Sequence, residues 1–544
     1  MNKSWKYAAA AALILGVTPV KAQSPVMLFE GLGDHHHPIS TTSTEAQKFF
    51  DQGLILTFGF NHAEAIRSFE KAHELDPKSP MPLWGKALAL GPNYNIDVDA
   101  AREKLAHETI EAARKLALNA PEGERAYVDA LAVRYSGKEN PDLKQLARDY
   151  AEAMGELSRR FPDDLDAATL YAESLMNLKP WQLWSLDHQP AEETAQIVST
   201  LESVLARDPN HPGANHLYIH AVEASAHPEW ALPSAQRLGS ISPAAGHLVH
   251  MPSHIYMLVG DYEAAATSNK IASHMDHNYI EKEQVKGVYP MLYYHHNLHF
   301  NAAANIMLGR HGEAKEAAKQ LTESVEKHAA DVPDMQIYIT EYFGPYPLFV
   351  ALRFEDWPTL LATPQPASNL PVSNGLWHYA RGVAFVQTGD LAKAGEHRAD
   401  LAKAIETLPE GSLYGLNAGS DILQIGLSVL DGRIAAAKGD RKAAVQHLEA
   451  AVTVQDKIAY NEPADWYYPV RETLGATLLL DGQAEKAEEV FRADLMKTRR
   501  NARSLFGLWH SLVAQGKTTD AELVRSQFEK EWRHSEIELK RETM

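Results

Sequence analysis

A repeat of about 34 residues constrains the fold of this chain more than any other feature. Its cleanest copy runs from Glu45 to Lys78 and has the pattern of two helices joined by a short turn. A helix pair of this length cannot bury its apolar face alone, so successive copies must stack and bury it against one another. The repeat therefore predicts an all-α chain in which each helix pair packs against its neighbours.

The copy at 45–78 resembles the tetratricopeptide repeat family. It carries the family's small residue at position 8, alanine at 20, aromatic at 24, alanine at 27 and proline at 32, which are Gly53, Ala65, Phe69, Ala72 and Pro77. Later copies are marked by Gly382 with Ala394, Gly432 with Ala444, Gly475 with Phe491, and Gly516 with Ala521. The resemblance covers most of the chain. It implies a right-handed superhelical solenoid whose groove is lined by positions 2, 5, 9 and 12 of each first helix.

Histidines occupy these groove positions in three successive repeats, whose position 20 is Ala231, Ala265 and Ala314. Positions 2, 5 and 9 give nine slots, of which only Gly213 and Ala303 are not histidine. The other seven slots hold His216, His220, His247, His250, His254, His296 and His299. With 26 histidines in 544 residues, chance placement would fill fewer than one slot.

Such a stripe of imidazoles predicts a metal site. Neutral imidazole binds Zn, Cu, Ni and Fe(II), and histidines on adjacent groove helices can converge on one ion. Glu223 follows His220 by three residues, so it lies on the same helix face as a candidate ligand or catalytic general base. A thiolate site is excluded because the chain has no cysteine. An open histidine site bearing Cu, Zn or Fe favours a metal-dependent hydrolase or oxidoreductase acting on a small molecule or peptide.

Two other functions remain open. One is a scaffold that binds peptides or proteins for envelope assembly, for which the C-terminal repeats would offer a surface; the other is a metal carrier without catalysis. A single buried histidine is more often structural than a ligand. We expect His227, His311 and His328 to be structural or solvated because they lie near turns and helix ends.

The chain divides into an arm at 23–44, a solenoid with the histidine-lined groove at 45–361, a linker at 362–375, and further repeats with a polar capping helix at 376–544. The arm carries His35, His36 and His37, and a solvated loop is favoured there over a ligand-bearing arm. Gly91 and Pro92 predict a turn that exposes Asn93, Tyr94 and Asn95. An insertion at 179–190, rich in Trp and Pro, is typical of a segment that closes over a groove, and a second insertion lies at 278–292.

Residues 1–22 have the pattern of a cleaved signal peptide, with Lys3 and Lys6 before an apolar run too short to span a bilayer. The segments GLGDHHHPIS, ALALGPNYN and GHLVHMPSHIY also resemble a group of secreted bacterial tetratricopeptide proteins. We therefore expect a periplasmic or secreted protein without a membrane span. The formal charge of −19 argues against nucleic acid as a partner.

Overall fold

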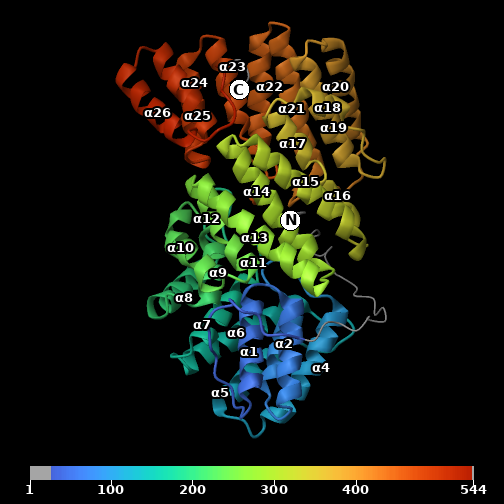
Figure 1. Cartoon of the computed structure of the whole chain (residues 1–544), viewed down its shortest axis with the longest axis vertical. Coiled ribbons are helices and arrows are strands. Elements are labelled where there is room, and N and C mark those ends of the chain that lie inside the picture. Colours follow the sequence, from blue (N-terminus) through green and yellow to red (C-terminus); the bar gives the residue numbers. More distant parts are fainter. Residues whose placement is uncertain (1–25, 542–544) are drawn as a thin grey trace. The chain divides into compact units, whose positions relative to one another are not determined.

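The computed structural model describes residues 26–541, so the predicted signal peptide at 1–22 lies outside the described residues. The regular secondary structure of these residues is almost entirely helical (Figure 1). The chain divides into two compact units, and each is considered on its own. Unit 1 comprises residues up to 255 together with 271–285, and unit 2 comprises 256–270 and everything from 286 onward. The predicted all-α helical-repeat fold is confirmed.

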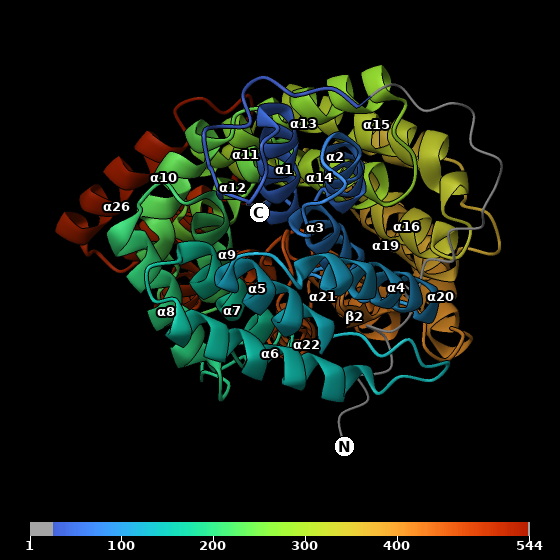
Figure 2. The same ribbon diagram turned by 90° about the horizontal axis from the view of Figure 1, so that it is seen from below.

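Unit 1 is built from antiparallel helix pairs, and consecutive pairs follow a curved row in the view of Figure 2. Its helices are α1 (Thr44–Phe58), α2 (His62–Leu75), α3 (Met81–Leu90), α4 (Ala100–Ala117), α5 (Glu122–Ala132), α6 (Leu143–Arg160), α7 (Leu165–Met176), α8 (Thr194–Arg207), α9 (Pro212–Val222), η3 (Pro228–Ala231), α10 (Leu232–Ile241) and α11 (Gly246–His250). The helices α12 (Pro252–Val259) and α13 (Tyr262–Glu283) contribute residues to both units.

The repeat signature explains how α1, α2 and α3 pack. The ring of Phe69 on α2 is fully buried between Gly53 on α1 and Gly85 on α3. A Cβ added to Gly53 would lie 2.7 Å from this ring, and one added to Gly85 would lie 2.4 Å from it. Glycine is required at both positions because a side chain there would overlap the aromatic ring that joins one repeat to the next.

Unit 2 continues the same construction. Its elements are η4 (Tyr289–Tyr294), α14 (His295–Leu308), α15 (His311–His328), η5 (Ala329–Asp331), α16 (Gln336–Phe343), α17 (Tyr346–Arg353), α18 (Trp357–Ala362), α19 (Pro371–Gln387), α20 (Leu391–Glu406), α21 (Gly419–Ala437), α22 (Arg441–Gln455), α23 (Val470–Leu480), α24 (Ala484–Lys497), α25 (Ala502–Ala514) and α26 (Thr518–Glu531). A short antiparallel hairpin of β1 (Leu413–Tyr414) and β2 (Asn417–Ala418) precedes α21, with Leu413 opposite Ala418.

Phe491 on α24 repeats the packing seen at Phe69. Its ring lies between Gly475 on α23 and Gly507 on α25, where an added Cβ would come within 2.6 Å and 2.1 Å of it. Gly507 is therefore the small residue of the last repeat. Gly516, which marks this repeat together with Ala521, lies instead in the turn before α26 with φ of +73°.

The predicted linker at 362–375 lies inside unit 2, where residues 363–370 join α18 to α19 and Pro371 already begins a helix. The tail that the sequence marks as a capping helix does not continue as one, since α26 ends at Glu531. Instead the Glu536 backbone N–H donates to the Gly309 carbonyl, and the Glu536 carboxylate accepts from the Gly312 N–H at 2.9 Å.

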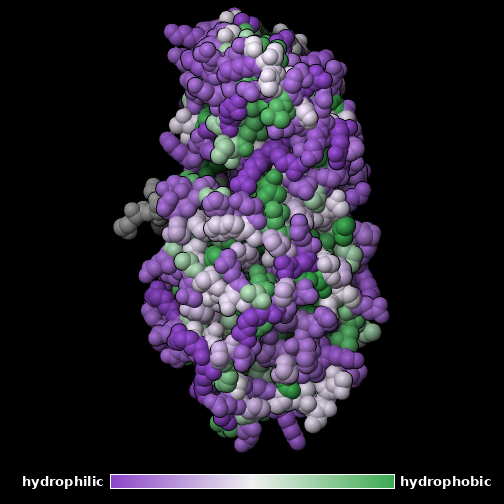
Figure 3. Space-filling model, turned by 90° about the vertical axis from the view of Figure 1, so that its left-hand side faces the viewer, coloured by the Kyte–Doolittle hydropathy of each residue, from purple (hydrophilic) through white to green (hydrophobic). Residues whose placement is uncertain are grey.

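Among residues 26–541, no helix is both long and apolar enough to cross a bilayer. On the face shown in Figure 3, hydrophilic residues dominate and hydrophobic residues occur in small scattered groups. An extended apolar patch would mark a surface that is covered by a partner, and this face does not carry one.

Candidate metal centre

Helix α9 places the first two histidines. His211 caps its N-terminus, with the ring Nδ1 accepting from the Ala214 N–H at 3.2 Å, and Pro212 occupies the first helical position. His216 and His220 follow one turn apart, with 0% and 2% of their surface exposed. Their rings are 5.0 Å apart between centroids. Both side chains therefore face the interior of unit 1 rather than solvent.

The tautomer of His216 is fixed by the end of α1. Its Nδ1 lies 2.6 Å from the carbonyl oxygen of Phe58, so Nδ1 carries the proton and donates it. The other ring nitrogen, Nε2, is buried and has no hydrogen-bond partner among the described residues. Burial holds the pKa of His216 well below its usual value, which keeps the ring neutral. His216 thus presents a lone pair toward the centre of the site.

His220 is oriented in the same way by Glu223. Its Nδ1 donates to Glu223 Oε1 at 2.9 Å, and its Nε2 is buried without a hydrogen-bond partner among the described residues. The second carboxylate oxygen, Oε2, lies 2.7 Å from Nδ1 of His254. Burial alone would raise the pKa of Glu223, but the two histidines outweigh it and lower that pKa. Glu223 is therefore an ionised carboxylate that two imidazole rings share.

His247, on α11, completes a group of three. One ligand atom from each of His216, His220 and His247 lies within 4.8 Å of the other two. The centroid of the His247 ring is 4.9 Å from that of His216. Three buried imidazoles converge at one point, and hydrogen-bond acceptors fix the orientation of two of them. Proteins use this arrangement to hold a transition metal.

His250 and His254 lie beside this group. Their Nε2 atoms are 2.9 Å apart, and Ser253 Oγ lies 3.3 Å from Nδ1 of His250. Two nitrogens on one ion with bonds of about 2.0–2.1 Å are separated by roughly 3 Å, so this pair also has the spacing of ligands. The ring of His254 is 5.6 Å from that of His220. Five of the seven predicted histidines are thus contiguous in unit 1.

Aromatic rings enclose the histidines, and sequence reasoning missed most of them. Phe60 contacts the rings of His216, His220 and His247 at centroid distances of 4.5, 6.1 and 5.5 Å. Trp181, from the insertion at 179–190, lies 5.8 Å from the ring of His220. Phe60 and Trp181 have φ of 56° and 60°, a region that bulky residues seldom adopt.

The predicted exposure of the turn after Gly91 is wrong for two of its three residues. Asn93 and Tyr94 are each 3% exposed, and the ring of Tyr94 packs against Trp181 and His220 at 5.4 and 5.0 Å.

The structure also explains why one groove slot holds glycine instead of histidine. A Cβ on Gly213 would lie 2.6 Å from the ring of Phe58, which fills that slot instead.

The remaining two predicted ligands, His296 and His299, are on α14 in unit 2. The ring of His299 is buried against Tyr342, Phe343 and Tyr346, the last at 4.2 Å, and burial lowers its pKa to about 3. Within residues 26–541, no group of three or more possible ligands includes His299. His296 is half-buried with its ring on Phe300 at 4.9 Å. Their assignment as ligands stays a prediction.

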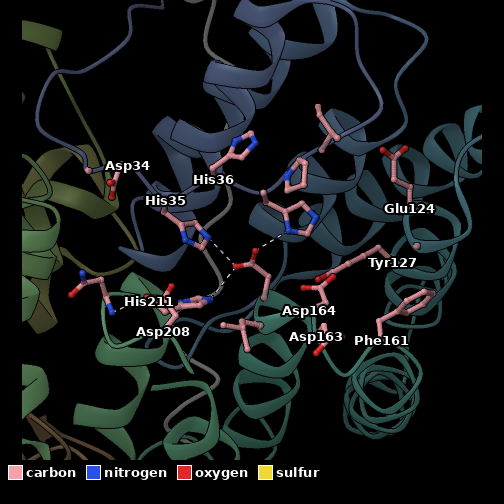
Figure 4. Close-up of a pocket in the computed structure, with 18 of the residues that line it drawn as sticks. Asp34, His35, His36, Glu124, Tyr127, Phe161, Asp163, Asp164, Asp208 and His211 are labelled. Carbon is pink, nitrogen blue, oxygen red and sulfur yellow. Dashed lines mark hydrogen bonds and ion pairs between the residues drawn. The ribbon is translucent and has the colours of Figure 1, made fainter. Parts of the chain in front are cut away.

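The arm is not a solvated loop, which corrects the favoured interpretation. His35 Nε2 lies 3.0 Å from one oxygen of Asp166 on α7, and His37 Nδ1 lies 2.8 Å from the other. His211 Nε2 lies 3.2 Å from the first oxygen. Figure 4 shows these ion pairs in a pocket of about 1110 Å³. Only His36 has an exposed side chain.

This second cluster is built for ion pairing rather than for metal. Because Nδ1 of His211 accepts the helix-capping hydrogen bond, its Nε2 must carry a proton and cannot offer a lone pair toward Asp166. Burial would lower the pKa of both His35 and His37, but Asp166 overcomes it and raises both. We refer to His35 and His37 as the arm histidines. Both pair with the buried carboxylate of Asp166, which favours their protonated form.

The packing of Phe69 and Phe491 against paired glycines, repeated in both units, decides the fold type. The chain has the fold of a tetratricopeptide-like helical repeat. No protein-family model and no curated protein sequence matches it.

Several solved structures are similar in fold to this repeat protein. The Cut9 and Hcn1 hetero-tetramer of the APC/C is 11% identical, over 90% of this chain and 88% of that one, with a TM-score of 0.29. The human IFIT1 dimer with m7Gppp-AAAA is 12% identical over 91% of both chains, with a TM-score of 0.31. The P58(IPK) TPR domain is 10% identical over 87% of this chain and 99% of that one, with a TM-score of 0.23. At these scores the likeness adds nothing to the assignment, which rests on the repeat packing.

Proposed function

We propose that unit 1 binds a transition-metal ion through His216, His220 and His247 and uses it for catalysis. The observation that carries this proposal is the pair of buried Nε2 atoms on His216 and His220. Each is left without a hydrogen bond because the other nitrogen of its ring is held by a fixed acceptor. Leaving buried polar atoms unsatisfied costs free energy, and a metal ion at this point would satisfy both.

The ligand set favours Zn, Cu or Fe(II), because three neutral imidazoles suit these ions and no cysteine is present for a thiolate site. Three protein ligands also leave coordination positions for water or substrate. A metal in such a site activates water for hydrolysis or supports an oxidation. Glu223 then acts as a positioning residue. Its short contacts with His220 and His254 suit it less well to the roles of ligand or general base that its spacing suggested.

A metal carrier is the second candidate, favoured by the nearness of His250 and His254, which could close the coordination sphere. The two functions differ in whether an exchangeable position remains. Azide added to the Cu(II)- or Co(II)-loaded protein should shift its absorption spectrum if the position is open. An unchanged spectrum supports the carrier.

Elemental analysis of the protein, purified without a histidine tag, tests the metal itself. We expect about one equivalent of Zn, Cu or Fe per chain, lost in a His216→Ala, His220→Ala variant. His227→Ala is the matched control, because His227 has an exposed side chain that pairs with Glu229 at 3.0 Å. If the parent protein holds no metal after loading and buffer exchange, the proposal is refuted.

Export of the chain belongs to the same proposal and is supported by the pattern of residues 1–22. A histidine site without cysteine needs no protection from an oxidising compartment. Sequencing the N-terminus of the protein recovered from the periplasm or medium should give Gln23 as the first residue.

A further inference from the structure

A second site lies in unit 2, where three arginines line one pocket. Arg353 at the end of α17, Arg433 on α21 and Arg503 on α25 share it with the rings of Tyr379, Tyr467 and Tyr468. Arg353 and Arg503 are only 7% and 5% exposed. Buried guanidinium groups are costly unless each is paired with an anion, so the partners of these three decide what the pocket is for.

Arg353 has such a partner. Its Nη1 and Nη2 donate to the two oxygens of Glu472 at 2.5 and 2.8 Å, a bidentate ion pair. The same carboxylate accepts from Asn501 Nδ2 at 2.8 Å. Glu472 thus accepts three hydrogen bonds, and its charge is balanced by Arg353.

Arg503 has no carboxylate of its own among the described residues. Its Nη2 donates to the backbone carbonyl of Arg353 at 2.9 Å, which is a neutral acceptor. Burial and the neighbouring Arg353 lower its pKa to about 9. The nearby Asp494 is occupied by Ser504 and Asn501 at 2.6 and 2.9 Å, and burial raises its pKa to about 7.

Arg433 also lacks a carboxylate partner among the described residues. Its Nη2 donates a long hydrogen bond of 3.4 Å to Thr473 Oγ1, and the neutral hydroxyl of Tyr468 is a second partner. Around it are the hydroxyls of Tyr379 and Tyr467, 3.2 Å from each other. Within the described chain the Nε atoms of Arg353, Arg433 and Arg503 are all buried without a hydrogen-bond partner.

The lining thus holds three guanidinium groups against one carboxylate, that of Glu355, whose backbone φ is 58°. We propose that this pocket binds a phosphate group, either inorganic phosphate or a phosphate monoester, between Arg433 and Arg503. Glu472 already neutralises Arg353, so the charge available to a ligand comes from Arg433 and Arg503. Two guanidinium groups, each able to donate paired N–H groups in one plane, match the oxygens of a phosphate better than the two oxygens of a single carboxylate. Thr473 and the tyrosine hydroxyls would supply further donors to the phosphate oxygens.

Titration calorimetry of the full-length chain tests the site, with inorganic phosphate and acetate as separate probes. We expect phosphate to bind and acetate to bind at least tenfold more weakly. Arg433→Gln should lower phosphate affinity by roughly 10- to 100-fold, the loss expected for a charge-assisted hydrogen bond. Arg398→Gln is the control, because Arg398 on α20 is paired with Asp431 at 2.8 Å and does not line the pocket.

If phosphate bound instead to a metal ion in unit 1, Arg433→Gln would bind it with the affinity of the parent. An unchanged phosphate affinity in that variant therefore overturns the proposal. Acetate binding as tightly as phosphate also overturns it, since the pocket would then select carboxylates. If Arg433→Gln does not fold by circular dichroism, Arg433→Lys decides. A lysine keeps the charge but not the planar fork, so phosphate affinity must fall measurably in it, and retention of full affinity overturns the assignment.

Discussion

Replacing Glu223 with glutamine tests the metal centre at the group that orients it. The carboxylate faces two ring nitrogens, Nδ1 of His220 at 2.9 Å and Nδ1 of His254 at 2.7 Å. A carboxylate accepts from both, whereas a glutamine offers one oxygen and one NH₂ group. In Glu223→Gln, one of the two histidines must face a donor.

That histidine has to change tautomer, because two donors cannot form a hydrogen bond. Its Nδ1 becomes the acceptor and its Nε2 takes the proton, which removes the lone pair directed at the metal. If His220 is the ring that changes, the protein loses one of three ligands or must break the contact with residue 223. Loss of an orienting partner of this kind typically lowers metal affinity about 10- to 100-fold, which is about 1.4–2.7 kcal/mol.

The assay is competition for Zn²⁺ against a chromophoric chelator, with helix content followed by circular dichroism. Glu202→Gln is the matched control: Glu202 on α8 accepts from the Tyr218 hydroxyl at 2.7 Å, away from the histidines. We expect Glu202→Gln to bind Zn²⁺ like the parent. Equal affinity in Glu223→Gln, with the fold intact, would refute the reasoning that Glu223 sets the tautomers.

Three further predictions concern other parts of the chain. Gly507→Ala should lower the melting temperature, because the added methyl would lie 2.1 Å from a buried ring and overpacking costs about 1–3 kcal/mol. As the control, Gly395→Ala on α20 meets nothing within 4 Å and should leave the melting temperature unchanged or raise it. A lower melting temperature in Gly395→Ala than in Gly507→Ala would contradict the packing argument. The arm histidines have raised pKa values, so their stabilising contribution is complete below pH 6.5 and is lost as pH rises through those values. Protection of residues 26–43 from hydrogen exchange, corrected for the intrinsic rise of the exchange rate with pH, should fall over that range, and a constant protection would count against the ion pairs. His299→Ala should leave the metal content unchanged because aromatic rings enclose that imidazole, and loss of metal would restore it as a ligand.

Sequence periodicity was enough to predict the helical repeats, because the determining contacts are local. Phe69 lies 16 residues from Gly53 and the same distance from Gly85, so one motif contains the residues that pack together. Composition does not separate the two kinds of glycine in the last repeat, where Gly516 lies in a turn with positive φ and Gly507 packs on a ring. Only the position of the Phe491 ring distinguishes the two.

The candidate site was predictable in part. Groove periodicity identified His216, His220 and His247 as neighbours, and the structure brings them together. It could not show that the arm histidines meet Asp166 some 130 residues away, because no periodicity relates an irregular arm to a helix. The same limit applies to Tyr94, which a Gly-Pro turn suggested was exposed and which instead covers His220.

What makes three histidines a candidate metal centre, rather than a row of buried imidazoles, is the set of groups behind them. His216 is turned by a carbonyl 158 residues earlier in the chain, at the end of α1, while His220 is turned by a carboxylate three residues later. Phe60, two residues after that carbonyl, is held at a positive φ with its ring against all three histidines. The first repeat therefore supplies both the acceptor and the aromatic cover for ligands carried by later repeats. The positive φ itself belongs to the fold, because the equivalent turns of later repeats hold Gly260, Gly309 and Glu355 at φ of 79°, 70° and 58°. What the site explains is the residue found at this turn: glycine would serve the solenoid alone, whereas the phenylalanine ring lies against three histidines.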